Sequence, residues 1–223
     1  MAMDRGSATE SIAARILAVT TAGPVRVGID GVTAAGKTTL GDELAGALKG
    51  QAREVIRATV DDFHNPPEVR YRRGRHSPEG YFLDGFDYGS IRELLLLPLG
   101  PDGSRRYRVG AFGQPEAASR AFEERVASND AILIVDGVFL FRAELDDCWD
   151  YRVFVEVDTA AAMERGIKRD AGWMGSLEAA RERYERRYGP GERLYLESVR
   201  PWGLADVVVE NDVPELPSLR FRA

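Results

Sequence analysis

The stretch VRVGIDGVTAAGKTTL, residues 25–40, decides the fold of this chain. It runs from an apolar, strand-like segment through a loop framed by glycines into a helix-like segment. The loop fits the pattern G-x-x-x-x-G-K-[ST], in which backbone N–H groups and the positive end of the next helix bind a phosphate. The lysine of this pattern reaches the β- and γ-phosphates, and the hydroxyl that follows is a ligand of Mg²⁺. We therefore predict ATP and Mg²⁺ as ligands, with nucleotide contacts from Gly31, Val32, Thr33, Ala34, Ala35, Gly36, Lys37, Thr38 and Thr39.

The composition is that of an ordinary soluble protein. Of 223 residues, 44% are hydrophobic and 30% charged, which suits one α/β domain over residues 1–223. The net charge of −6 argues against a general nucleic-acid partner, and no apolar run approaches the ~20 residues of a membrane span. We expect a cytoplasmic protein without a signal peptide, in monomeric or homo-oligomeric form. The one cysteine, Cys148, can form no intrachain disulfide and is expected to be a packing residue.

Short apolar runs alternate with helix-like segments along the chain. This alternation predicts an α/β fold of the P-loop NTPase type, with a parallel sheet flanked by helices. The predicted strands are residues 24–30, 54–62, 131–141, 151–158 and 205–212. The predicted helices are residues 38–48, 89–99, 159–170, 176–189 and 192–200. We further expect an insertion on the substrate side at about residues 62–90, an extended pair at 104–112 with its turn at 100–103, and a helical lid at about 165–200.

An acidic residue suited to the metal follows the apolar run at residues 131–135. The run AILIVDG ends in Asp136, the pattern of a Walker B strand. The carboxylate of such a residue lies at the carboxyl edge of the sheet, where ligands collect in open α/β proteins. A strand-ending aspartate can also simply belong to a turn. With the P-loop present, we predict that Thr38 and Asp136 hold the metal.

A pair of carboxylates lies one βα unit after the P-loop. The chain contains no N-K-x-D guanine motif, which argues against a GTPase. The segment ATVDDF instead ends a strand in Asp61 and Asp62, where a kinase needs a base for the attacking hydroxyl. The alternative for this pair is a helix N-cap or a turn.

Seven stretches, taken in order, resemble the uridine kinase / phosphoribulokinase group of P-loop kinases. They cover most of residues 25–212 and are GVTAAGKTT (31–39), VDDFH (60–64), FLDGFDY (82–88), RRYRVGAF (105–112), VDGVF (135–139), RGIKRD (165–170) and ADVVVEND (205–212). The P-loop is specific for the superfamily, and the ordered set is moderately specific for this group.

The resemblance implies a role for each matched position. Asp61 falls on the catalytic base of uridine kinases, and the segment 84–87 precedes the helix beside the acceptor. Arg165 and Arg169 match the arginines that lead the lid; four residues apart, they share a helix face from which they could clamp the triphosphate. A solvated helix face is the alternative for both. The resemblance thus implies Asp61, Lys37 and Arg169 as catalytic residues, Arg165 as an ATP contact, and an acceptor site of Asp61, Phe63, Asp84, Phe86, Tyr107 and Arg108.

The sequence departs from the family on the acceptor side. The histidine expected after the tyrosine-bearing strand is absent, and AGWMGS stands where the lid should be basic. The run EVRYRRGRH instead carries Arg70, Arg72, Arg73 and Arg75, which could bind an anionic acceptor or form a solvated loop. The chain has only two histidines, at positions 64 and 76, and both are expected to be packing or surface residues.

The sequence therefore predicts an ATP-dependent kinase that acts on the hydroxyl of a small molecule. The resemblance suggests a nucleoside such as uridine or cytidine. A sugar, a sugar phosphate, pantothenate or glycerate is the alternative within this class. A non-catalytic, ATP-binding regulatory module is the alternative of another class. The acceptor and the preferred nucleoside triphosphate stay open.

Overall fold

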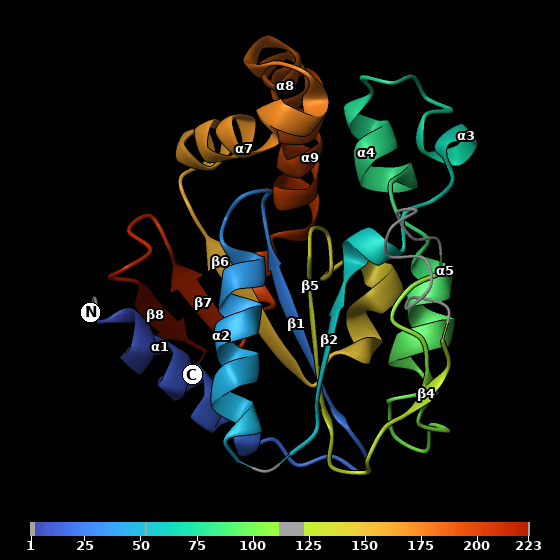
Figure 1. The fold of residues 1–223 in the computed structure, drawn as a ribbon, viewed down its shortest axis with the longest axis vertical. Helices are drawn as coiled ribbons and strands as arrows, with labels where there is room; N and C mark the ends of the chain where they lie inside the picture. The colour runs from blue at the N-terminus through green and yellow to red at the C-terminus, as the bar shows by residue number, and fades with distance from the viewer. Residues whose placement is uncertain (1–2, 52, 112–122, 223) are drawn as a thin grey trace.

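The computed structural model describes residues 3–51, 53–111 and 123–222, and its centre is a six-stranded sheet (Figure 1). The strand order is β2-β5-β1-β6-β7-β8; β8 is antiparallel to β7 and every other pair is parallel. The predicted parallel sheet is thus confirmed. The strands are β1 (Val25–Gly31), β2 (Val55–Thr59), β5 (Ile132–Gly137), β6 (Tyr151–Glu156), β7 (Val207–Glu210) and β8 (Ser218–Phe221).

Helices cover both faces of this sheet. On one face, α1 (Arg5–Leu17) and α2 (Lys37–Lys49) share a hydrophobic cluster with β1 and β6. The other face is covered by α5 (Tyr88–Ile91) with its π-helical continuation Arg92–Leu96 and by the 3-10 helix Ala143–Cys148. Above the carboxyl edge lie two groups of helices that face each other in Figure 1. They are α3 (Pro67–Arg70) and α4 (Pro78–Asp84) on one side, and α7 (Thr159–Met174), α8 (Leu177–Arg183) and α9 (Gly189–Val199) on the other.

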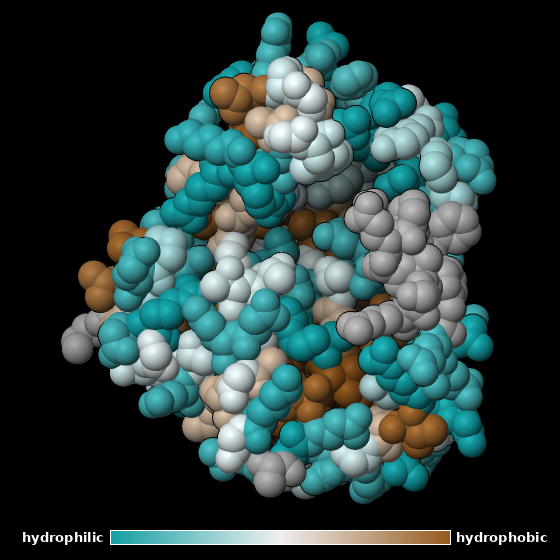
Figure 2. Space-filling view, viewed as in Figure 1, coloured by the Kyte–Doolittle hydropathy of each residue, from teal (hydrophilic) through white to brown (hydrophobic). Residues whose placement is uncertain are grey.

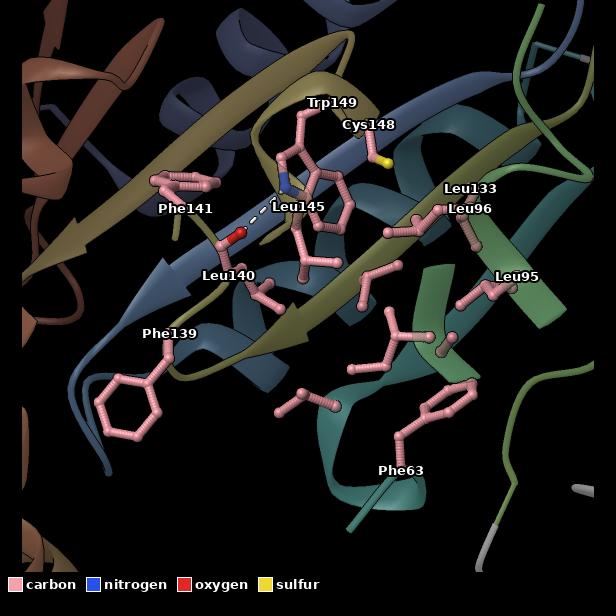
Figure 3. Close-up of a cluster of buried hydrophobic side chains, with 14 of the residues drawn as sticks. Phe63, Leu95, Leu96, Leu133, Phe139, Leu140, Phe141, Leu145, Cys148 and Trp149 are labelled. Atoms are coloured by element: carbon pink, nitrogen blue, oxygen red, sulfur yellow. Dashed lines mark hydrogen bonds between the residues drawn. The ribbon is translucent and has the colours of Figure 1, made fainter. Parts of the chain in front are cut away.

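The core behind β1 and β5 is built of large apolar side chains around Trp149 (Figure 3). The indole Nε1 donates a hydrogen bond to the carbonyl of Leu140 at 3.0 Å, so its polar atom is satisfied inside the core. A Cβ at Gly28 of β1 would lie 3.0 Å from the same indole, and this close approach requires glycine. Cys148 is buried in this cluster, as expected of a packing residue, and burial raises the pKa of its thiol to about 11.

Two predicted elements differ in detail from the structure. The extended segment does not turn back at 100–103: β3 (Arg106–Tyr107) pairs with β4 (Arg125–Val126), because the residues before the turn are helical. Residue 112 of that segment lies outside the described residues. The helices predicted at 176–189 and 192–200 form one continuous segment, α8 to α9, through a π-helical turn at Tyr184–Tyr188. Pro190 follows this turn; it lacks an N–H donor and crowds the preceding turn, which favours such a bulge.

The strand predicted at 54–62 is shorter than expected. It ends at Thr59, and Val60–Asp62 form a 3-10 turn in which the Thr59 hydroxyl accepts a hydrogen bond from the Asp61 N–H at 3.3 Å. This cap places the Asp61 side chain at the carboxyl edge of β2. Among the helices that the structure describes, none is long and apolar enough to cross a membrane.

Candidate active site

The loop between β1 and α2 wraps the carboxyl end of the central strand. Gly36, the residue before α2, has φ = 97°, a left-handed conformation that favours glycine. A Cβ at this position would also lie 2.6 Å from the side-chain nitrogen of Asn211, which donates a hydrogen bond to the carbonyl of Ala35 at 2.7 Å. Asn211 follows β7, which is separated from β1 by β6 in the sheet, so a residue from a distant part of the chain supports the loop. The first N–H groups of α2 therefore point to the region where a phosphate would bind.

Lys37 lies almost fully buried at the base of this loop. Its Nζ donates a hydrogen bond to the carbonyl of Val32 at 2.7 Å. Burial lowers the pKa of Lys37, and the nearby charges of Glu192, Asp30, Asp136 and Asp61 act in the opposite direction. These carboxylates compensate a buried ammonium group that would otherwise be costly.

Thr38 and Asp136 meet as the sequence predicts. The Thr38 hydroxyl donates to Asp136 Oδ2 at 2.6 Å, and the other carboxylate oxygen accepts from Arg57 Nη2 at 2.8 Å. A hydroxyl and a carboxylate are hard oxygen ligands of the kind that Mg²⁺ takes, with the remaining positions left to phosphates and waters. The donor set therefore fits Mg²⁺ bound with a nucleotide, and Arg57 orients the carboxylate.

A cavity of about 530 Å³ joins the loop to the carboxyl edge of β2. Lys37, Thr38, Asp136 and Asp61 all line it. The His64 side chain also lines it. Its Nδ1 lies 2.7 Å from the Asp61 carbonyl oxygen and its ring 4.6 Å from that of Phe86, so it packs and lines the cavity at once. Burial lowers the pKa of His64, which favours the neutral imidazole.

Helix α7 borders the same cavity. Arg169 of α7 lines it and also lines a second cavity of about 250 Å³ beside the P-loop, where Arg165 lies. Arg169 Nε donates to Asp170 at 2.7 Å, and Asp170 also accepts from the Tyr184 hydroxyl at 2.7 Å. Burial would raise the pKa of Asp170, but these two partners outweigh burial and lower it. Arg169 is thus held where the two cavities meet.

The arginine run on the substrate side divides into two pairs. Arg70 and Arg75 line the 530 Å³ cavity together with Asp61. Arg72 and Arg73 turn away and pair with Asp84, with Arg73 Nε 2.7 Å from Asp84 Oδ2. The sequence left open whether these arginines belong to a solvated loop or to a pocket wall. Arg70 and Arg75 belong to the pocket wall, whereas Arg72 and Arg73 do not.

Four residues predicted to contact the acceptor lie away from the cavity. Phe63 is fully buried in the core behind β2, because the 3-10 turn rotates it away from Asp61. Asp84 is buried between its two arginines, Tyr107 is buried in the same core cluster as Phe63, and Arg108 is not part of the cavity wall. Of the predicted acceptor residues, the structure brings only Asp61 and Phe86 into the cavity.

Two buried acids beneath the loop were not predicted. Glu192 of α9 accepts a hydrogen bond from the Thr33 N–H at 2.7 Å, and burial raises its pKa. Asp30 of β1 accepts from the N–H groups of Gly31 at 2.7 Å and Phe141 at 3.2 Å, and from the Tyr195 hydroxyl. An acidic residue inside the strand VRVGIDG was the available signal for Asp30, whereas Glu192 has none in the local sequence.

The burial of Asp30 predicts a specific pH dependence of stability. Burial, opposed by hydrogen bonds and by Lys37, raises the pKa of Asp30 from 3.8 to about 6. Between these pH values the folded state therefore binds more protons than the unfolded state. The stability that protonated Asp30 contributes below pH ~4 is lost as the pH rises through ~6. We expect Asp30→Asn, which does not titrate, to gain up to about 3 kcal/mol relative to wild type between pH 4 and pH 8. Urea unfolding of both proteins at several pH values measures this, and a constant difference would contradict it.

Comparison with known proteins finds similarity to kinases of small molecules. No protein-family model matches the chain. Uridine-cytidine kinase B of Dictyostelium discoideum is 28% identical over 189 residues, which cover 83% of this chain and 74% of the relative. The solved structure of a possible uridine kinase from Bacillus stearothermophilus is 25% identical, with a TM-score of 0.67 over 91% of this chain and 97% of that chain. D-glycerate 3-kinase from Cryptococcus neoformans, at 13% identity and a TM-score of 0.65 over 97% of each chain, shows the fold alone. The resemblance expected from the sequence is confirmed.

Proposed function

We propose that this chain, a P-loop kinase by sequence and fold, transfers the γ-phosphoryl group of ATP to a hydroxyl of a small molecule. One observation carries the proposal: Asp61 shares a single cavity with Lys37 and with the Thr38–Asp136 pair. The acceptor oxygen forms a bond to the γ-phosphorus while the bond to the β,γ-bridging oxygen breaks. Asp61 takes the hydroxyl proton, and ADP is released.

The side chains around the cavity divide the remaining tasks. Lys37 and Arg169 supply fixed positive charge on two sides of the transferred group, where negative charge spreads in a loose transition state. Thr38 and Asp136 would hold Mg²⁺, which when bound with the nucleotide neutralises phosphate charge. Arg57 and the packing of β5 fix the position of Asp136.

The assay that tests this function is acceptor-dependent release of ADP from ATP–Mg²⁺. The names of the relatives make uridine and cytidine the first acceptors to test, followed by sugars, sugar phosphates, pantothenate and glycerate. Release of ADP that depends on one of these acceptors would support the proposal. If none of these acceptors stimulates the release of ADP, a non-catalytic ATP-binding module would instead be favoured.

We also propose that residues of about 165–200 close as a lid over bound nucleotide, excluding water from the reacting groups. Trp173 of α7 lines the cavity although 67% of its surface is exposed. Closure should bury this indole, and ATP–Mg²⁺ should therefore change the tryptophan emission of the wild type. We expect Trp173→Phe to lose most of this change and Trp202→Phe, which alters a residue packed on Phe154, to keep it. If ATP–Mg²⁺ changed the tryptophan emission of Trp173→Phe as much as that of the wild type, lid closure would be contradicted.

A further inference from the structure

Four arginines gather around the ring of Tyr71, next to Asp61. This arginine cluster consists of Arg70 and Arg75 from the segment of α3 and α4, and of Arg183 and Arg187 from the lid. The guanidinium carbons of Arg70, Arg75 and Arg187 lie 5.4, 5.3 and 5.2 Å from the ring centre, and Arg183 lines the same cavity as Tyr71. In Figure 1 the two contributing groups of helices face each other above the sheet edge.

The cluster carries positive charge that no carboxylate balances among the residues that the structure describes. None of its four members forms an ion pair there, whereas other arginines nearby do: Arg169 with Asp170, Arg181 with Glu164, and Arg186 with Glu182. Acids are not scarce, since the chain has 36 of them against 30 lysines and arginines. Like charges held together are unfavourable unless an anion binds among them.

Two details show that parts of this cluster are held by the protein rather than free in solvent. Arg187 is buried, and donates to the main-chain carbonyls of Arg70, Arg75 and Ser77, which fixes the segment that carries the other arginines. The Nε of Arg70 is buried and has no hydrogen-bond partner in the described part of the chain. A buried donor without a partner costs free energy, which a bound anion would recover.

We propose that the arginine cluster binds an anionic group of the phosphoryl acceptor, so that the acceptor is a hydroxylated small molecule carrying a phosphate monoester or a carboxylate. This inference rests on the proposed kinase function and specifies its acceptor. Guanidinium groups pair with both anions through two parallel hydrogen bonds. A group bound there leaves an acceptor hydroxyl close to Asp61, because Arg70, Arg75 and Asp61 line one cavity.

The position of the cluster separates it from the nucleotide. The arginines beside the P-loop are Arg165 and Arg169, and they line the smaller cavity with Gly36 and Thr39. No member of the arginine cluster contributes to that smaller cavity as the structure describes it. Loss of a cluster arginine should therefore weaken the binding of the acceptor and spare that of ATP.

The first test compares acceptors that differ only in the anionic group. ADP release is measured with ribose and ribose 5-phosphate, with glycerol and glycerol phosphate, and with glycerol and glycerate; uridine is included as the neutral nucleoside. We expect an anionic member to exceed its neutral partner by at least about 100-fold in kcat/KM. The phosphate and carboxylate pairs identify which anion is used. Preference for uridine or a neutral sugar would overturn the inference and leave the kinase function intact.

The second test uses Arg75→Gln, with Arg186→Gln as the matched control on the outer face of the lid. We expect Arg75→Gln to raise the KM of the anionic acceptor by about 10- to 100-fold and to leave the KM of ATP unchanged. Arg186→Gln should change neither. An unchanged acceptor KM in Arg75→Gln, or a parallel rise in the KM of ATP, would contradict acceptor binding by the cluster.

A binding measurement keeps the inference independent of turnover. Calorimetric titration of ribose 5-phosphate and of glycerate into protein saturated with a non-hydrolysable ATP analogue should show binding that Arg75→Gln weakens. Absence of binding by both compounds overturns the inference. Binding without any ADP release in the kinase assay would instead count against the proposed function and support an anion site in a regulatory module.

Discussion

Asp61→Asn is expected to lower acceptor-dependent ADP release by about 10²- to 10⁴-fold while leaving the affinity for ATP–Mg²⁺ close to that of the wild type. The amide keeps the shape of the side chain but cannot take the hydroxyl proton. The proposed nucleotide contacts lie in the P-loop and do not include Asp61, so they should be unaffected. Steady-state kinetics with saturating ATP and a fluorescent nucleotide titration measure the two quantities separately.

The adjacent carboxylate provides the matched control for this prediction. Asp62 is half-buried and is not part of the cavity wall; burial, together with the charge of Asp61, raises its pKa. Asp62→Asn removes one negative charge from the same turn but should keep most of the turnover. If Asp61→Asn retained wild-type turnover, or if Asp62→Asn lost as much, the assignment of the base to Asp61 would be wrong.

The donor side of the site could be predicted from the sequence because its geometry is local. A strand, a loop of fixed length and a helix place Lys37 and Thr38 wherever this pattern occurs. Asp136 adds one long-range step, which the parallel pairing of β1 and β5 fixes by register, with Ile29 beside Asp136.

The acceptor side could not be predicted because it depends on how separate helices pack. Arg70, Arg72, Arg73 and Arg75 are equivalent in the sequence, and only the burial of Asp84 decides which pair is drawn away from the cavity. Tyr107 matches a family position, yet its short ribbon packs it into the core. Likewise, Arg183 lines the cavity only because the helix α8 that carries it lies above the same sheet edge as α3 and α4.

Lys37→Ala is expected to lower kcat/KM for ATP by at least about 10²-fold, through weaker ATP binding, slower transfer or both. The ammonium group is the one lysine charge of the P-loop, and it cannot be replaced by Arg169, which stands on the lid side of the cavity. In the wild type the charge of Lys37 opposes the effect of burial on Glu192, so the pKa of Glu192 should rise further in the variant.

Lys49→Ala, at the exposed end of the same helix, is the control and should leave kcat/KM unchanged. Thermal unfolding of both variants shows whether the loop still folds. A folded Lys37→Ala protein with wild-type affinity and turnover would contradict the role of this loop in binding and transferring the phosphoryl group.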